Sequence, residues 1–296
     1  MKKPLIIGLI CLVASAALLI WGFQSPASPS SAPQRQVVLL IENDTGSFLM
    51  QLRKGMQEAA SALDVRITVE KALPDPLAQV RALAEEGADA ALLLLADPKP
   101  LLSALEEAKF PVVLIGQTVR GQVCVTGDDR ACGEALVSRA LALAEPSRVL
   151  WLTQDTDPRG LERTDGAIAQ LKQKGIAILP WPQSPQTLAS YGAVAASTQA
   201  ITQELANLKS TGSLGPGVSV LGMDTGDSRV ADLEDGHVQV MAMDSPYAMG
   251  YTAIGLIPSL VAEKLAPSLH LCRITLVDPS TMYLAENVKL VFPLLQ

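Results

Sequence analysis

The sequence contains few histidine, cysteine and aromatic residues. Because many metal sites and catalytic centres are built from histidine and cysteine, this scarcity limits the kinds of site that the chain can form. Its 296 residues include two His and four Cys, and aromatic residues make up 4%. Neither His237 nor His270 lies near a cysteine or carboxylate cluster with zinc-ligand spacing. The chain also lacks a G-x-S-x-G nucleophile elbow, a Walker A lysine loop and a G-x-G-x-x-G turn after its first strand. We therefore predict a protein that is not an enzyme and that uses no metal or cofactor.

One enzymatic alternative is an activity of the α/β-hydrolase kind. It requires a nucleophile and a base, and no such combination stands out in the sequence. Asp155 and Asp157 form a pair of carboxylates, but beside Pro158 they are typical of a solvated turn. Only unexpected turnover would support this alternative.

The chain also lacks an excess of positive charge. Its formal net charge is −7 at pH 7, and no basic stripe is present that would neutralise phosphates. This balance argues against nucleic acid as a partner. Small neutral or cationic ligands remain compatible with it.

The few cysteines do not form a disulfide framework. Cys124, Cys132 and Cys272 lie outside the amino-terminal segment, and because three is an odd number, at least one is unpaired within the chain. Cys124 and Cys132 are close enough in sequence to form a bridge, whereas buried free thiols are the simpler interpretation. Local geometry decides between the two.

The amino terminus has the pattern of a membrane segment followed by a spacer. Residues 4–23 carry no charge, and a helix of about 20 residues spans about 30 Å, the thickness of a bilayer core. Lys2 and Lys3 precede it, so we expect residues 1–3 in the cytoplasm and the main domain outside. A cleaved signal peptide, giving a periplasmic or secreted protein, is the alternative. Residues 24–35 are rich in Pro and Ser and read as a linker.

After this linker, apolar runs of strand length alternate with segments of helical period, which predicts α/β architecture with parallel sheets. Two similar series of such units indicate two lobes. We expect Leu271 to Val277 and Val288 to Phe292 to be the last two strands.

The first strand and helix enclose a polar turn. Val37 to Ile41 is a continuous apolar run, and Phe48, Leu52 and Met56 lie on one face of the helix that follows. The polar residues 42–47 between them fall outside the carboxyl end of the strand, where open α/β sheets bind ligands. This segment indicates a binding function.

Three segments resemble the type I periplasmic binding proteins, the ribose- and galactose-binding family whose fold also forms the sensor domain of sugar-responsive repressors. They read NDTGSFLMQLRKGMQEAA, VTGDDRACGEALVSRAL, and VSVLGMDTG followed by VQVMAMDSPYAMGYTAI. The resemblance extends over residues 36–296. It implies two lobes, each a parallel sheet flanked by helices, joined by a three-segment hinge that closes on a ligand.

The resemblance also implies where the chain crosses between lobes. We expect crossovers near Gly121, Asp244 and Val277. Lobe 1 would then comprise residues 36–120 and 246–276, and lobe 2 residues 121–245 and 277–296.

The resemblance also implies ligand-binding residues after several strands and at the Arg-x-x-Gly pattern of Arg163 to Gly166. Hydroxyl-rich ligands need multivalent polar partners and a ring to stack on. The expected residues are Asn43, Asp44, Ser47, Phe48, Gln117, Asp128, Asp129, Arg163, Thr198, Asp224 and Asp244.

Several of these residues have a structural alternative. Phe48 is equally compatible with a core position. Asp128, Asp129 and Asp244 are compatible with helix capping, and Arg163 with an exposed ion pair to a neighbouring acid.

The chain departs from the family pattern at several positions. Leu49 stands where a second aromatic residue is usual, Gly46 where Asn is common, and Thr198-Gln199 where an Asn-Asp pair is usual. Between Leu179 and Gly192 the chain is too short for a full helix, so the second lobe looks trimmed. Trp181 is either a replacement ring for the ligand or a loop residue packed on the lobe.

These observations predict an extracytoplasmic protein that captures a small ligand, a sugar or sugar-like compound, for the permease of an ABC importer. A ligand sensor that signals to a membrane kinase or chemoreceptor is the alternative from a different class. A third possibility is a degenerate clamp without a small-molecule ligand.

Overall fold

The computed structural model describes residues 34–42, 46–224, 230–264 and 267–292. Within these ranges no helix combines the length and apolar character needed to cross a membrane. The expected membrane segment, residues 4–23, lies outside the described residues.

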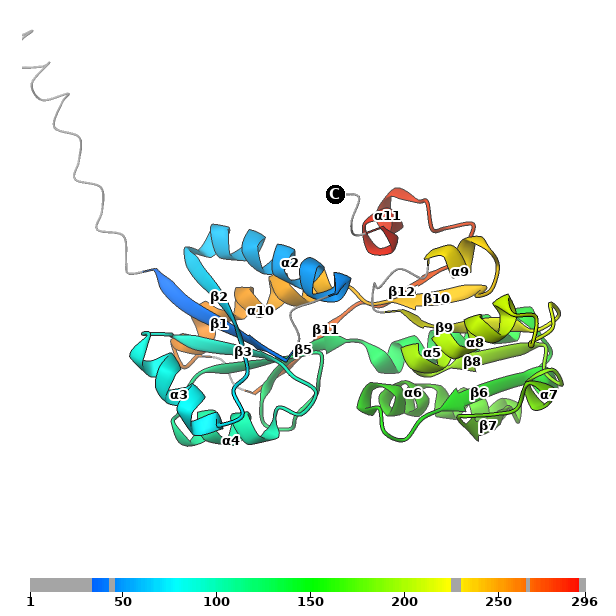
Figure 1. Ribbon diagram of the computed structural model, residues 1–296, viewed down its shortest axis with the longest axis horizontal. Helices are drawn as coiled ribbons and strands as arrows, with labels where there is room; N and C mark the ends of the chain where they lie inside the picture. The colour runs from blue at the N-terminus through cyan, green and yellow to red at the C-terminus, as the bar shows by residue number, and fades with distance from the viewer. Residues whose placement is uncertain (1–33, 43–45, 225–229, 265–266, 293–296) are drawn as a thin grey trace, which may run out of the picture. The chain divides into compact units, whose positions relative to one another are not determined.

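The first of two six-stranded sheets has the order β11-β5-β4-β3-β1-β2 (Figure 1). Its strands are β1 (Arg35–Ile41), β2 (Val65–Lys71), β3 (Ala90–Leu94), β4 (Val112–Ile115), β5 (Val123–Gly127) and β11 (Leu269–Cys272). β1 runs parallel to β3 with Leu39 opposite Leu92. Val37 to Ile41 are at most 3% exposed, as expected for a parallel strand covered on both faces.

Two pairs of helices cover this sheet, as Figure 1 shows. On one face lie α2 (Ser47–Leu63) and α10 (Pro246–Val261), and on the other α3 (Pro76–Glu85) and α4 (Lys99–Glu107). α2 and α10 approach closely because a Cβ at Gly55 would lie 2.0 Å from the carbonyl oxygen of Tyr247. Asp75 caps α3 by accepting hydrogen bonds from the amides of Leu77 and Ala78.

The second sheet has the order β12-β10-β9-β8-β6-β7. Its strands are β6 (Val149–Thr153), β7 (Ala177–Pro180), β8 (Ala193–Ala196), β9 (Ser219–Asp224), β10 (Val240–Met243) and β12 (Thr275–Val277). The edge strand β12 runs antiparallel to β10, and the pairs β6–β7, β6–β8, β8–β9 and β9–β10 are parallel.

Helices also cover both faces of the second sheet. α5 (Asp129–Leu143) and α6 (Pro158–Lys174) share one core cluster with it, and η1 (Pro146–Arg148) leads from α5 into β6. The other cluster contains residues of α7 (Pro185–Leu188), α8 (Gln199–Ser210), α9 (Val230–Glu234) and α11 (Ala285–Val291). α7 is a single turn, in agreement with the short chain between Leu179 and Gly192.

The crossovers differ from the expected positions at two places. β5 pairs with β4 and β11 in the first sheet, so the chain leaves this sheet after Gly127 and not near Gly121. The last crossover falls between Cys272 and Thr275, ahead of Val277. An apolar run such as that of β5 identifies a buried strand, but hydrophobicity alone does not indicate which sheet will contain it. Between Met243 and Pro246 the chain passes from β10 to α10.

The end of the chain was also predicted incorrectly. The expected strand from Val288 to Phe292 is largely helix α11, in which Val291 is 1% exposed within the second core cluster. A short, mostly apolar segment of this length suits a helix or a strand equally, and here packing selects the helix. The expected single strand from Leu271 to Val277 divides into β11 and β12.

Candidate functional site

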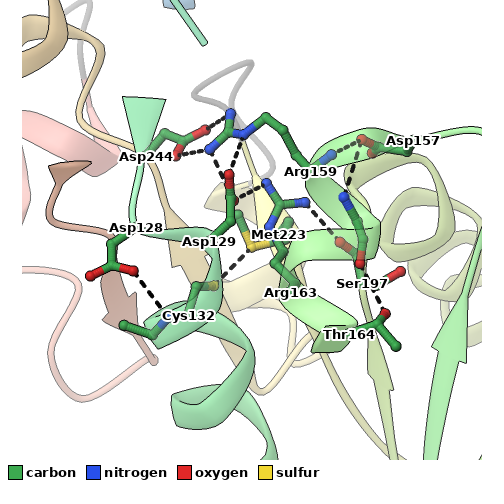
Figure 2. A network of polar contacts seen from close by, with 12 residues as sticks. Asp128, Asp129, Cys132, Asp157, Arg159, Arg163, Thr164, Ser197, Met223 and Asp244 are labelled. Atoms are coloured by element: carbon green, nitrogen blue, oxygen red, sulfur yellow. Dashed lines mark hydrogen bonds and ion pairs between the residues drawn. The ribbon is translucent and has the colours of Figure 1, made fainter. Parts of the chain in front are cut away.

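A buried cluster of two arginines and two aspartates lies where α5 and α6 begin (Figure 2). Arg159 is at its centre. Its Nε donates to Oδ2 of Asp129 at 2.7 Å, and its Nη1 donates to Oδ2 of Asp244 at 2.8 Å. Its Nη2 donates to Oδ1 of Asp129 at 3.1 Å and to Oδ1 of Asp244 at 2.8 Å. Both carboxylates have 0% side-chain exposure.

Local sequence explains why these side chains meet. Asp157 accepts hydrogen bonds from the amides of Arg159 and Gly160, and Pro158 occupies the first turn, so together they fix the start of α6. Asp129 is the first residue of α5, and Asp244 directly follows β10. Gly127 provides the remaining space, because a Cβ there would lie 2.6 Å from Nη2 of Arg159.

Arg163 completes the cluster one turn further along α6. Its Nη2 lies 2.7 Å from Oδ1 of Asp129, and its Nη1 donates to the carbonyl oxygen of Ser197 at 2.7 Å. Nε of Arg163 and Oγ of Ser197 are buried and have no hydrogen-bond partner among the described residues. The positive charges of the two guanidinium groups therefore balance the negative charges of the two carboxylates. Two buried polar atoms beside them remain available for hydrogen bonding.

The charges in the cluster perturb the ionisable groups around it. Burial by itself would lower the pKa of Arg159, but the charges and hydrogen bonds of Asp244 and Asp129 outweigh burial and raise that pKa. Burial and the charge of Asp129 raise the pKa of Glu162, one helical turn from Arg159, against the opposing effect of a hydrogen bond from Thr118. Arg159 is therefore held as a cation.

A pocket of about 700 Å³ adjoins the cluster, and Arg159 forms part of its wall. One side consists of residues that follow β3 and β4, including Gln117, and the other of residues at the start of α6. Gln117 is held in place because its Nε2 donates to the carbonyl oxygens of Leu95 and Ala96. Thr126 also lines the pocket, is 1% exposed, and its Oγ1 has no partner among the described residues.

Several solved structures have a similar fold. A solute-binding protein of an ABC transporter from Agrobacterium vitis, with bound D-fucose, is 16% identical, covers 87% of this chain and 100% of its own, and has a TM-score of 0.70. A periplasmic ribose ABC transporter protein from Conexibacter woesei is 16% identical over 88% of this chain and 97% of its own, with a TM-score of 0.72. A chain from a XylFII–LytSN complex is 15% identical over 83% and 98%, with a TM-score of 0.65. At such identities the likeness shows the fold.

The sequence model of the family described as periplasmic binding protein domain matches residues 37–264. The chain belongs to this family. A search of curated protein sequences finds no match. The expected fold class, the two-lobed α/β fold of type I periplasmic binding proteins, is confirmed.

Within this periplasmic binding protein fold, four of the expected site residues come together. Asp129, Arg163 and Asp244 belong to the buried cluster, and Gln117 lines the adjoining pocket. The alternative of an exposed ion pair for Arg163 is wrong, because Asp165 pairs with Arg130 instead.

Other expected residues have structural contacts elsewhere. Asp128 caps α5 through the amide of Ala131 at 3.1 Å, and Thr198 caps α8 through the amide of Ile201 at 3.2 Å. Phe48 packs against the first core cluster, and Ser47 is buried at the start of α2. Asn43 and Asp44 lie outside the described residues, and the side chain of Asp224 is not described either.

Two further questions from the sequence are answered by packing. Cys124, Cys132 and Cys272 are buried free thiols, and Cys132 lies 3.4 Å from Sδ of Met223 (Figure 2). Burial raises the pKa of Cys132 to about 12. Trp181 packs against the second core cluster and donates to Glu204 at 3.1 Å, so it is a loop residue packed on its lobe.

Sequence reasoning missed Arg159. The available signal was its position directly after Asp157-Pro158, a capping pair that marks the start of a helix. That signal places Arg159 at the end of the sheet where ligand loops gather, but it does not identify two aspartates as its partners.

Proposed function

We propose that this protein captures a sugar outside the cytoplasm and passes it to an ABC importer. The observation that carries the proposal is the pocket of about 700 Å³ that adjoins the cluster of Arg159, Arg163, Asp129 and Asp244. Pockets of about 300–1,000 Å³ are typical of small-molecule sites. Two solved structures of the same fold are sugar or solute-binding proteins of ABC transporters.

The polar groups around the pocket suit a ligand rich in hydroxyls. Thr126 and Gln117 supply oxygen acceptors, and Thr126 also supplies a donor. Because Oγ1 of Thr126 is buried without a partner, a ligand hydroxyl that bonded it would recover a hydrogen bond that the protein otherwise lacks. We assign ligand contact to Gln117, Asp129, Arg163 and Asp244. Asn43, Asp44 and Asp224 remain predictions.

We further propose that residues 4–23 tether the protein to the membrane. This segment is uncharged and long enough to span a bilayer core. The spacer of residues 24–35 would then hold the binding domain close to a permease. Binding without chemical turnover is sufficient for such a role.

A sensor is the second candidate function. It is favoured by the likeness to a chain in the XylFII–LytSN complex, in which a protein of this fold assembles with a second protein. Importer and sensor use the same sugar site, so ligand binding supports both. Co-purification with a permease or with a membrane kinase distinguishes them.

The test is thermal melting of the full-length protein against a panel of neutral aldopentoses and aldohexoses. A ligand at 100 times its dissociation constant stabilises the folded state by about 2.7 kcal/mol, which corresponds to a shift of several degrees. We expect such a shift with one group of sugars and its loss in Gln117→Ala. Binding of no sugar would contradict the proposal and would favour a clamp without a small-molecule ligand.

A further inference from the structure

The aspartates of the proposed sugar site are already occupied by a group from the protein. Arg159 donates to all four carboxylate oxygens of Asp129 and Asp244, at 2.7 to 3.1 Å. Neither carboxylate has measurable side-chain exposure. A sugar hydroxyl therefore gains full access to these acceptors only if the guanidinium of Arg159 moves.

The fold provides a defined place for the guanidinium of Arg159 between Asp129, Asp244 and Gly127, which we call its seat. Four of its N–H donors are used by the two aspartates. Gly127 leaves the space that Nη2 fills, since a Cβ at this position would come within 2.6 Å of it. The same Cβ would lie 2.8 Å from Oδ1 of Asp244, so the backbone at Gly127 lies close to both Asp244 and the guanidinium.

Neutral hydroxyls are weak competitors for this seat. Hydrogen bonds between two ionised groups are about twice as strong as those between neutral groups. Displacing Arg159 would also leave two buried carboxylates with Arg163 as their cation, and an uncompensated buried charge is strongly unfavourable. Each neutral sugar thus replaces a stronger internal interaction.

We propose that Arg159 determines specificity as an internal competitor, which occupies Asp129 and Asp244 and weakens the binding of neutral sugars at this site. The inference rests on the proposed sugar-binding function and deepens it. It assigns a role to a residue that the family resemblance did not indicate.

The experiment compares two double variants of the full-length protein by isothermal titration with the same sugars. Arg159→Gln with Asp244→Asn removes one cation and one anion from the buried seat, so the remaining charges, Arg163 and Asp129, stay balanced. Arg130→Gln with Asp165→Asn makes the same change at an exposed pair, where the side chains are 63% and 72% exposed. We expect the buried variant to bind a neutral sugar at least tenfold more tightly than the natural protein, and the exposed variant to bind within twofold of it.

The possible outcomes separate the two proposals. If the natural protein binds a sugar and the buried variant binds it no more tightly than the single variant Asp244→Asn does, competition by Arg159 is wrong and the sugar-binding function stands. If only the buried variant binds, competition by Arg159 is supported, and the sugar-binding function of the natural protein is wrong. If neither binds any sugar, the sugar-binding function is wrong and the competition with it.

A second variant keeps the test valid if the double variant does not fold. Arg159→Lys keeps the positive charge, but an ammonium has three donors without the planar fork that reaches both aspartates. We expect sugar affinity to rise about threefold, because the ammonium would bind the two aspartates less firmly than the guanidinium does. Weaker sugar binding by Arg159→Lys would overturn the proposal.

Discussion

At the scale of single residues, Asp129 is the carboxylate of the buried cluster that pairs with both arginines. It accepts from both Arg159 and Arg163 and has no exposed side-chain surface. Asp129→Asn would leave the cluster with an excess buried positive charge, and we expect a loss of about 3–5 kcal/mol in the free energy of unfolding. Urea denaturation measures this loss. The control Asp165→Asn, at an exposed pair, should cost less than about 1 kcal/mol.

Gly127 is a second position at which one residue controls the site. Ala at this position would place its Cβ 2.6 Å from Nη2 of Arg159 and 2.8 Å from Oδ1 of Asp244. We expect Gly127→Ala to destabilise the protein by about 1–3 kcal/mol through overpacking. The control is Gly215→Ala, where a Cβ would meet nothing within 4 Å. Equal urea midpoints for the two variants would show that Arg159 does not need this space.

The sequence predicted Asp129 and Asp244 as site residues, but it did not predict which side chains they contact. The cap at Asp75 follows from a local Asp-Pro pattern, because its partners are two and three residues away. Arg159 and Asp244 are 85 residues apart. Spacing along the chain carries no information on such a contact. The role of Arg159 as partner of Asp244 follows only from the folded structure, in which the start of α6 lies beside the end of β10.

At the scale of elements, the packing of α5 against α6 depends on glycine in both helices. A Cβ at Gly166 would lie 2.1 Å from the carbonyl oxygen of Arg130, and one at Gly133 would lie 1.9 Å from that of Arg163. We expect Gly166→Ala to force the helices apart and to lower stability by about 1–3 kcal/mol.

The matched control lies in another helix. Gly255 in α10 has open space around its Cβ position, so Gly255→Ala should raise stability by about 0.5–1 kcal/mol through helix propensity alone. Opposite signs for the two substitutions in thermal melting would establish close helix contact as the cause. A gain in both would contradict it.

The turn after β12 links stability to pH through Asp278. Burial alone would raise the pKa of Asp278, but hydrogen bonds from Ser280 and Thr281 and the charge of Arg139 outweigh burial and lower it. Since the folded pKa is below the unfolded value, the stabilisation is present above about pH 4 and disappears as the pH falls through the folded pKa.

We therefore expect Asp278→Asn to lower stability by about 1 kcal/mol at pH 7. The difference from the natural protein should shrink as the pH falls from 4 towards 3. Urea denaturation across this range tests the sign. A difference that stayed constant with pH would show that the carboxylate charge contributes nothing.

At the scale of elements, the sequence predicted whether a segment forms a helix or a strand better than it predicted which strands pair with one another. The continuous apolar run from Val37 to Ile41 predicted β1, since both faces of a parallel strand are covered. The same kind of run did not indicate that β5 pairs with β4 and β11 in the first sheet. Sheet membership depends on contacts between distant segments, which is why two crossovers were misplaced.

At the scale of the whole molecule, the proposed tether makes a prediction that is independent of the sugar site. Residues 4–23 carry no charge, so the full chain should fractionate with membranes and resist extraction at high pH. Intact mass should then correspond to a chain that retains this segment. A product that begins after the segment and appears in the soluble fraction would establish cleavage as a signal peptide instead.

Charge in the middle of the tether provides the decisive comparison. Each Arg at the centre of a membrane helix costs about 2.5–3.5 kcal/mol in insertion. Leu12→Arg with Val13→Arg should therefore release the protein from membranes, whereas Leu12→Ala with Val13→Ala should leave it bound. Because residues 12 and 13 are not among the residues proposed to bind sugar, both variants should bind sugar as the natural protein does. Retention of the arginine variant on membranes would mean that a surface of the folded domain, and not this segment, holds the protein there.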